Sequence, residues 1–234
     1  MTTINKSLAY SGETLIYINE CELFWPGYID PCNPLNLPPN TVRVRTNDGA
    51  VPNKDYATYE TATLVSGTSD VYDVYKSGTN FYSFLDRSTN VVEVLGANTT
   101  GITHMGDMFY ECTSLTTVHL FNTSSVTDMG GMFYWCTSLT SVPLFDTSSV
   151  TDMQSMFQNC TSLTSVPLFN TSSVTDISIM FMNCKNVQSG ALALYQQVST
   201  QTNPPSSHRM AFRNCGSDTT TGAAELAQIP DDWK

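Results

Sequence analysis

The sequence predicts a protein of the α+β class, built as a solenoid of coils of about 24 residues that follows a small β-rich N-terminal module. Three observations lead to this prediction. Four segments repeat one pattern at a constant spacing, two apolar periodicities alternate inside each repeat, and the residues before 77 follow neither pattern. A fixed period of roughly 20 to 50 residues is typical of stacked units that cannot bury an apolar face alone.

The repeats align without a gap. They begin at Ala97, Phe121, Phe145 and Phe169, and the second copy reads FNTSSVTDMGGMFYWCTSLTSVPL. Because equivalent residues recur at a constant interval, we expect them to form columns along the stack.

The first apolar periodicity of each repeat indicates a short helical turn. Met129, Met132, Phe133 and Cys136 fall at positions i, i+3, i+4 and i+7. This spacing places apolar side chains on one face of an amphipathic helix. We therefore expect one short helical turn in each coil.

The second periodicity indicates a short strand. Leu139, Val142 and Leu144 form an apolar segment that is followed by the turn sequence DTSS or NTSS. Asp, Asn and Ser favour turns because their side chains bond to nearby backbone groups. Pro143 and Pro167 lack the N–H group that a strand ladder needs, so any strand there must be interrupted or very short.

The pattern also divides the chain. We expect a degenerate first coil at 77–96, regular repeats at 97–190 and a C-terminal cap at 191–234, within one solenoid domain at 77–234. Terminal repeats are atypical because they cover the open ends of a stack.

Residues 1–76 contain the β-rich runs TLIYINECELFW, NTVRVRT, TATLV and DVYDVY, separated by Pro- and Gly-containing segments. Such punctuation predicts a small antiparallel β module, which we interpret as a possible attachment domain.

Composition excludes several classes of partner. The formal net charge is −11, and only 13% of the residues are charged. Nucleic acids and anionic membranes require clustered Lys and Arg, so neither is expected as a partner. No apolar run approaches the ~20 residues of a membrane-spanning helix. The first residues lack the basic and apolar regions of a signal peptide, which predicts a chain that is cytoplasmic at birth or separated from its leader.

Four of the seven cysteines follow the repeat. They are Cys112, Cys136, Cys160 and Cys184, one in each copy at the same position. A cysteine repeated at an inward position acts as a small buried apolar residue, so we expect reduced thiols in one column. Cys21 and Cys32 could pair across a short loop.

The repeat pattern, L-x-x-V-x-L followed by V-T-x-M-x-x-M-F-x-x-C-x-x-L, resembles BspA-like leucine-rich repeats of the Met-Phe-x-x-Cys type. The resemblance covers about two thirds of the chain, from Phe81 to Trp233. It implies a leucine-rich-repeat solenoid that binds proteins or cell-surface material, as in bacterial surface adhesins and related phage-encoded proteins. It implies no catalytic residue and no cofactor.

A column of aspartates has three possible roles. Asp128, Asp152 and Asp176 each precede the first apolar residue of a predicted helical turn. Asp is a preferred residue for capping free N–H groups at that position, and this is the favoured interpretation. The column is also a weak candidate for a Ca²⁺ site or for paired catalytic carboxylates.

The outward positions between the fixed Met and Cys residues differ from copy to copy. Aromatic side chains and Met are enriched in recognition surfaces, so we expect these positions to face a ligand. The candidate binding strip is Tyr110, Glu111, Tyr134, Trp135, Gln158, Asn159, Met182 and Asn183.

The sequence thus favours a non-enzymatic binding and structural protein, and we expect a phage virion-associated protein for host recognition or attachment. Its partners would be a host-surface protein or glycan and, through the N-terminal module, other virion subunits, with a homo-oligomer as a further possibility. The alternatives are a bacterial cell-surface or secreted adhesin whose leader was removed, and a carbohydrate-cleaving solenoid.

Overall fold

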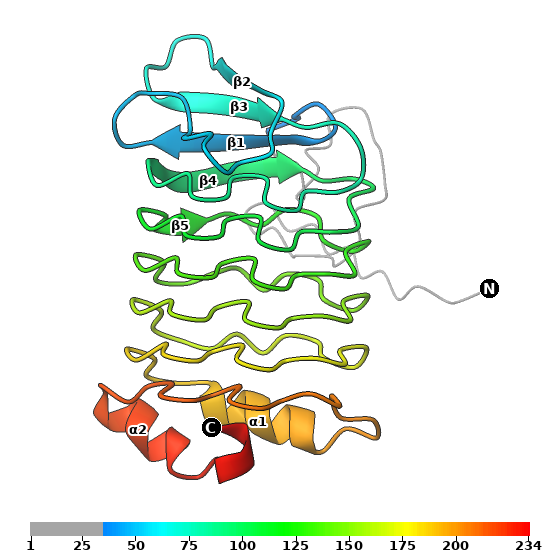
Figure 1. Ribbon diagram of the computed structural model, residues 1–234, viewed down its shortest axis with the longest axis vertical. Helices are drawn as coiled ribbons and strands as arrows, with labels where there is room; N and C mark the ends of the chain where they lie inside the picture. The colour runs from blue at the N-terminus through cyan, green and yellow to red at the C-terminus, as the bar shows by residue number, and fades with distance from the viewer. Residues whose placement is uncertain (1–34) are drawn as a thin grey trace, which may run out of the picture.

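The computed structural model describes residues 35–234, whose N-terminal part forms one five-stranded sheet (Figure 1). The strands are β1 (Thr41–Thr46), β2 (Thr61–Leu64), β3 (Val71–Tyr75), β4 (Val91–Asn98) and β5 (Thr117–Val118), in the order β2-β3-β1-β4-β5. The pairs β2–β3, β3–β1 and β1–β4 are antiparallel, and β4–β5 is parallel. The sheet is therefore mixed.

The predicted β-rich runs from residue 40 onward form β1, β2 and β3, whereas the run TLIYINECELFW and the pair Cys21 and Cys32 lie outside the described residues. The sheet crosses the predicted domain boundary after residue 76, because β1 pairs with both β3 and β4. The division into two domains at that point stays a prediction.

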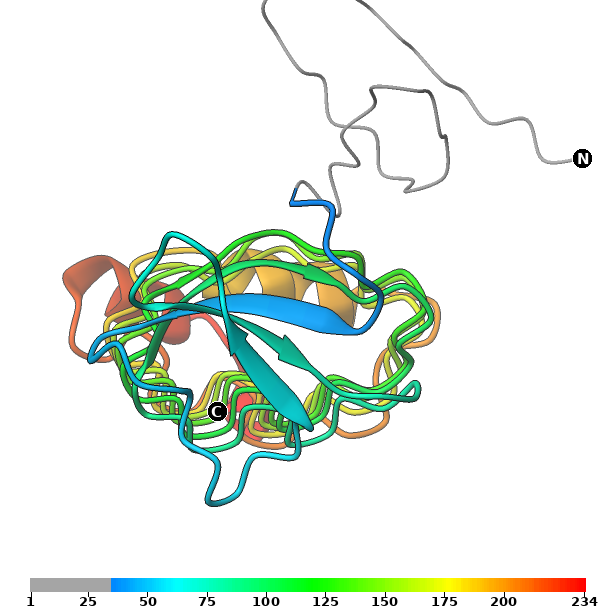
Figure 2. The ribbon, with the colours of Figure 1, turned by 90° about the horizontal axis from the view of Figure 1, so that it is seen from above.

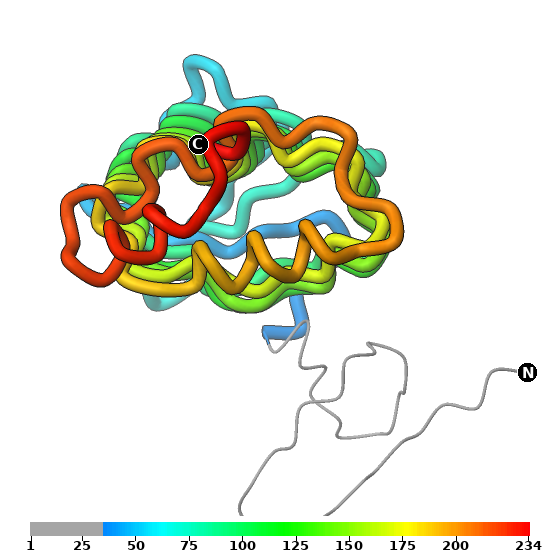
Figure 3. The backbone as a smooth tube through the Cα atoms, turned by 90° about the horizontal axis from the view of Figure 1, so that it is seen from below, coloured from blue at the N-terminus to red at the C-terminus, as the bar shows by residue number. Residues whose placement is uncertain are grey.

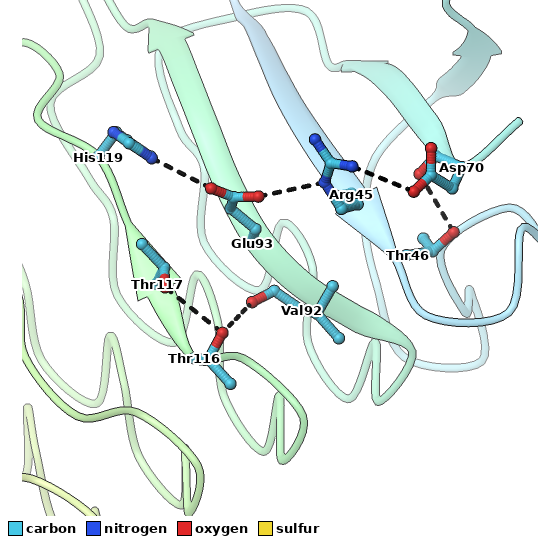
Figure 4. Close-up of polar contacts among 8 residues, drawn as sticks. All are labelled: Arg45, Thr46, Asp70, Val92, Glu93, Thr116, Thr117 and His119. Carbon is cyan, nitrogen blue, oxygen red and sulfur yellow. Dashed lines mark hydrogen bonds and ion pairs between the residues drawn. The ribbon is translucent and has the colours of Figure 1, made fainter. Parts of the chain in front are cut away.

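One face of β1 is buried and the other carries charge. Val42 and Val44 are fully buried, while Arg43 lies 2.6 Å from Asp73. Arg45 of β1 pairs with Asp70, the residue before β3, and with Glu93 of β4 (Figure 4). Alternation of apolar and polar residues at period two explains this division.

Below the sheet, the chain descends in layers of one repeat each, which lie over one another when seen from above (Figures 1 and 2). We call the surface formed by 81–88, 105–112, 129–136, 153–160, 177–184 and 208–215 the turn face. Backbone amides along this face alternate between two kinds of bond. Those of Met108 and Tyr110 donate to the residue three positions earlier, whereas those of Asp107 and Phe109 donate to carbonyls of the next layer.

The predicted fold class is wrong. We expected an α+β leucine-rich-repeat solenoid in which each coil contains a short strand and a short helical turn, after a separate β-rich module. The structure has instead a five-stranded mixed sheet and two short α-helices, α1 (Ala191–Ser199) and α2 (Thr220–Leu226). Residues 99–190 consist of turns and isolated bridges, with two-residue β5 as their one strand.

The physical reason lies in the hydrogen bonds. A helix needs bonds that span four residues, but half of the amides on the turn face bond to another layer instead. In the segment predicted as a strand, Leu139 is buried, but Leu144 is 62% exposed. The sequence pattern identified the inward positions of the apolar stripe. It did not identify the backbone conformation that places these residues inside.

The interior contains two aligned columns of side chains. Phe109, Phe133, Phe157, Phe181 and Phe212 stack with neighbouring ring centroids 5.2 to 6.0 Å apart. The four predicted cysteines are buried and free, as is Cys215 in the last layer. Burial raises the pKa of these thiols, so they are held as neutral apolar groups.

The end of the stack opposite β2 is covered by α1, α2 and the 3₁₀ turn η1 (Asp231–Trp233) (Figures 1 and 3). Trp233 packs against Phe212, the last ring of the phenylalanine column, and against Tyr195 of α1. Among residues 35–234, no helix is long and apolar enough to span a membrane.

Candidate functional site

Each layer of the turn face contains two residues in the left-handed backbone region, four positions apart. The first column is Ser83, Asp107, Gly131, Ser155, Ile179 and Met210, and the second is Arg87, Glu111, Trp135, Asn159, Asn183 and Asn214. Residues other than Gly and Asn rarely adopt this backbone region, because their Cβ atom approaches the following carbonyl oxygen.

The second column contains half of the predicted binding strip. The strip has two parts, which differ in the side chains that they carry. Asn159, Asn183 and Asn214 form a ladder in which each side-chain amide donates to the oxygen of the one before, at 2.9 Å. Gln158 and Met182, which flank the ladder, are half-buried. The Asn side chains in the C-terminal part of the strip therefore already have hydrogen-bond partners within the ladder.

The N-terminal part of the strip is aromatic. The rings of Tyr110 and Tyr134 stack with centroids 4.5 Å apart and planes within 5° of parallel. Trp135 lies next to Tyr134, at 6.3 Å between centroids, and is 45% exposed. Burial, with smaller contributions that include Tyr134, raises the pKa of Tyr110 to about 12. The three side chains form one continuous aromatic surface.

Glu111 belongs to an ion pair at the upper edge of this surface. Its carboxylate lies 3.1 Å from the guanidinium of Arg87. The same guanidinium lies over the ring of Tyr56, 4.1 Å from its centroid, and 5.7 Å from the centroid of Tyr110. One cation on this face is thus held by aromatic rings and a carboxylate together.

Beside the aromatic surface lies a groove of about 360 Å³. Its lining residues come from four consecutive layers and are Tyr82, Gly106, Asp107, Tyr110, Asp128, Gly130, Gly131, Tyr134, Asp152, Gln154 and Ser155. We call it the acidic groove, because three carboxylates and three tyrosine rings line it.

Asp107 narrows the acidic groove by lying over Gly131. A Cβ built at Gly131, where φ is +62°, would come within 2.0 Å of the Asp107 carboxylate. Both the left-handed backbone and the close approach therefore require Gly at this position. Burial raises the pKa of the Asp107 carboxyl.

The aspartate column caps turns rather than helices. The Oδ1 atoms of Asp128, Asp152 and Asp176 accept hydrogen bonds from the backbone amides two residues later, at 2.9, 2.8 and 2.7 Å. Our expectation of helix capping is corrected accordingly, because no helix follows. Burial, and then the charges of Asp128 and Asp176, raise the pKa of Asp152. Within 35–234, no group of three acidic, His or Cys side chains is arranged to hold a metal ion.

A second hollow, of about 590 Å³, lies on another side of the stack near α1. Leu144 and Leu168 line it together with Gln197 and Gln201, and both leucines are at least half exposed. No residue of the predicted binding strip lines this second hollow.

Sequence reasoning missed Tyr82, Asp107, Arg87 and Tyr56 as site residues. Tyr82 lies in the degenerate first layer, one repeat before Gly106, and its ring is 3.1 Å from where a Cβ of Gly106 would lie. The predicted repeat frame includes that layer, but the approach of Tyr82 to Gly106 joins two layers and is visible only in the structure. No sequence signal pointed to Tyr56, because it lies outside the repeats.

Residues 79–194 match the family model described as Mycoplasma protein of unknown function, DUF285. This part of the chain is therefore similar to that family, and the match supports a resemblance to BspA-like repeats over these residues. Searches of curated proteins and of solved structures each found no match.

Proposed function

We propose that this chain is a non-enzymatic binding protein whose partner covers the aromatic surface of Tyr110, Tyr134 and Trp135. The observation that carries the proposal is the state of Trp135. It is 45% exposed and has a φ of +57°, at a position that three other layers occupy with Asn. A bulky residue held in the left-handed region at the surface costs free energy, and such strain clusters at functional sites.

The chemistry of the rings suits recognition. Tyr and Trp combine large apolar area with few rotatable bonds, and they dominate the energy of many interfaces when a partner covers them. The stacked pair Tyr110 and Tyr134 is fixed in orientation before a partner arrives. A preordered surface binds with a smaller entropic cost.

The aspartate column supports binding over catalysis. Hydrolysis of a glycoside requires one carboxyl that donates a proton and one carboxylate that does not, set apart by different surroundings. Asp128, Asp152 and Asp176 all make the same turn bond to the same backbone position. This shared turn bond suits a structural role along the column.

The biological setting of this binding is part of the proposal. Resemblance to BspA-like repeats favours a partner at a cell surface, either a protein or a glycan, and we propose attachment of a phage virion to its host as the setting, with the bacterial surface as the alternative. Detection of the chain in purified virions would support the first setting, and its detection only on bacterial surfaces would support the second.

The proposal is tested by the double substitution Tyr134→Ser with Trp135→Ser. Attachment of the purified chain to host cells should fall at least tenfold, while the melting temperature changes by only a few degrees. The matched control is Gln158→Ser with Met182→Ser, which alters residues of the same face in the two following layers and should leave attachment unchanged. Undiminished attachment of the first variant would refute the aromatic surface as the binding site.

A further inference from the structure

The acidic groove is shaped by rings and bare backbone as well as by carboxylates. Gly106 and Gly130 line it without side chains, and Tyr110 and Tyr134 present stacked rings beside it. Tyr82, which is 50% exposed, lies at its upper end. A flat group could lie against these rings while reaching the acidic side chains.

The carboxylates of the groove have no cation. Within residues 35–234, none of Asp107, Asp128 and Asp152 takes part in an ion pair, whereas Glu111 on the same face is paired with Arg87. Asp128 and Asp152 each use Oδ1 for a turn amide, and no described residue donates to either Oδ2. Partly buried like charges without a counter-charge repel one another, and a cation between them would relieve that repulsion.

One guanidinium of this protein is already held by aromatic rings and a carboxylate. Arg87 lies over the ring of Tyr56, near the ring of Tyr110, and against the carboxylate of Glu111. Guanidinium groups favour such positions because they stack on aromatic faces and bond to carboxylates in their own plane. The acidic groove also combines tyrosine rings with carboxylates, and within the described residues these carboxylates have no cation.

We propose that the acidic groove binds an arginine side chain of the partner protein, with the guanidinium beside the edges of the stacked rings of Tyr110 and Tyr134 and paired with Asp128 and Asp152. This inference rests on the proposed function, because it assigns the chemistry of the partner at the aromatic surface. The net charge of −11 adds long-range attraction for a basic segment.

The test uses a small probe and its neutral isostere. Nα-acetyl-arginine amide and Nα-acetyl-citrulline amide are titrated into the full chain, and the ring signals of Tyr110 and Tyr134 are followed by NMR. Arginine should shift both signals with saturation, and citrulline should not, because it lacks the charge. Equal binding of citrulline, or no saturable shift with arginine, overturns the proposal. Tighter binding of Nα-acetyl-lysine amide overturns the assignment to a planar cation.

Substitutions then locate the site. Asp128→Asn with Asp152→Asn keeps the Oδ1 atoms that accept the turn bonds and removes the charges, so the fold should persist and arginine affinity should fall about tenfold. The matched control is Asp146→Asn, which makes the same kind of turn bond, to Ser148, but lies outside the acidic groove, and it should leave affinity unchanged. An unchanged affinity in the double variant refutes the site.

The same variants separate this inference from the proposed function. If attachment to cells requires Trp135 but not the two aspartates, the aromatic surface is the binding site and the arginine assignment is wrong. If the arginine probe binds as expected while attachment does not need Tyr134 and Trp135, the groove is a cation site and the proposed function is wrong.

Discussion

In the second left-handed column of the turn face, residues 87, 111 and 135 are Arg, Glu and Trp, whereas residues 159, 183 and 214 are all Asn. The backbone is the same in both halves, with φ between 52° and 63° at all six positions. The Asn residues relieve the conformation and bond to one another. The three N-terminal residues form no such ladder and bear an ion pair and an exposed indole instead.

On one repeated backbone, the Asn positions stabilise the fold, and the Trp position is the one that we propose for recognition. Asn is the non-glycine residue that tolerates the left-handed region best, since its short side chain bonds locally. Where the chain uses Asn, the position serves the fold. Where it uses Trp in the same geometry, the conformational cost is offset by no ladder bond, which is the reason to look for a ligand there.

The largest expected effect tests whether the core is packed equally well beneath the N-terminal and the C-terminal half of the column. Phe133→Ala and Phe157→Ala each remove one ring from the continuous stack, and each should lower the free energy of unfolding by about 3–5 kcal/mol. Denaturant unfolding of the two variants measures this. A much smaller loss at Phe133 would show that the N-terminal layers are less tightly packed, and the comparison of surfaces would then need a different explanation.

The next effect comes from placing the N-terminal residue in the C-terminal half. Asn159→Trp puts a bulky residue at φ +63° and removes the amide that accepts from Asn183. The free energy of unfolding should fall by about 1–2 kcal/mol. Denaturant unfolding checks the value, with Asn159→Gly as a control that loses the ladder bond but relieves the backbone. Equal losses in both variants would mean that the backbone conformation costs little.

A smaller effect of opposite sign is expected for the reverse change. Trp135→Asn extends the amide ladder by one layer, because Asn159 could donate to the new side chain, and it relieves the backbone. Stability should stay level or rise by up to about 1 kcal/mol, while attachment to cells is lost. Thermal unfolding and the attachment assay give the two readouts. A clear loss of stability would show that the indole is needed for packing.

The smallest effect concerns Asp152, whose folded-state pKa is raised above its ordinary value, first by burial. Below both pKa values the group is protonated in the folded and unfolded states and changes nothing. As the pH rises, the unfolded state loses the proton first, so the ionised carboxylate disfavours folding above the folded-state pKa.

Asp152→Asn should therefore equal or exceed the parent chain in stability at neutral pH, by less than about 0.5 kcal/mol, with the difference vanishing in acid. Asp152→Ala should cost about 1 kcal/mol, because it loses the turn bond to Gln154. Unfolding measured from pH 3 to 7 distinguishes these outcomes. Failure of Asn to substitute for Asp, together with a Ca²⁺-dependent melting temperature, would indicate a metal site.

The amino-acid pattern alone was enough to identify which residues of the repeats face inward. The spacing of Met129, Met132, Phe133 and Cys136 identified buried side chains, and the structure buries all four. It also indicated turns at the NTSS segments, because short polar side chains have local backbone partners whatever the surrounding fold.

The partners of the backbone amides, by contrast, could not be read from that pattern. An apolar spacing of i, i+3, i+4 and i+7 fits a helix, and it also fits successive turns with two left-handed residues. The pattern indicates which side chains are buried. It does not indicate which carbonyl accepts the hydrogen bond of each amide. Amides of one layer meet carbonyls of the next, far along the chain, so the choice of turns over helix required the neighbouring layer. For the same reason, Tyr82 and the unpaired carboxylates of the acidic groove became a site only when four layers were brought together.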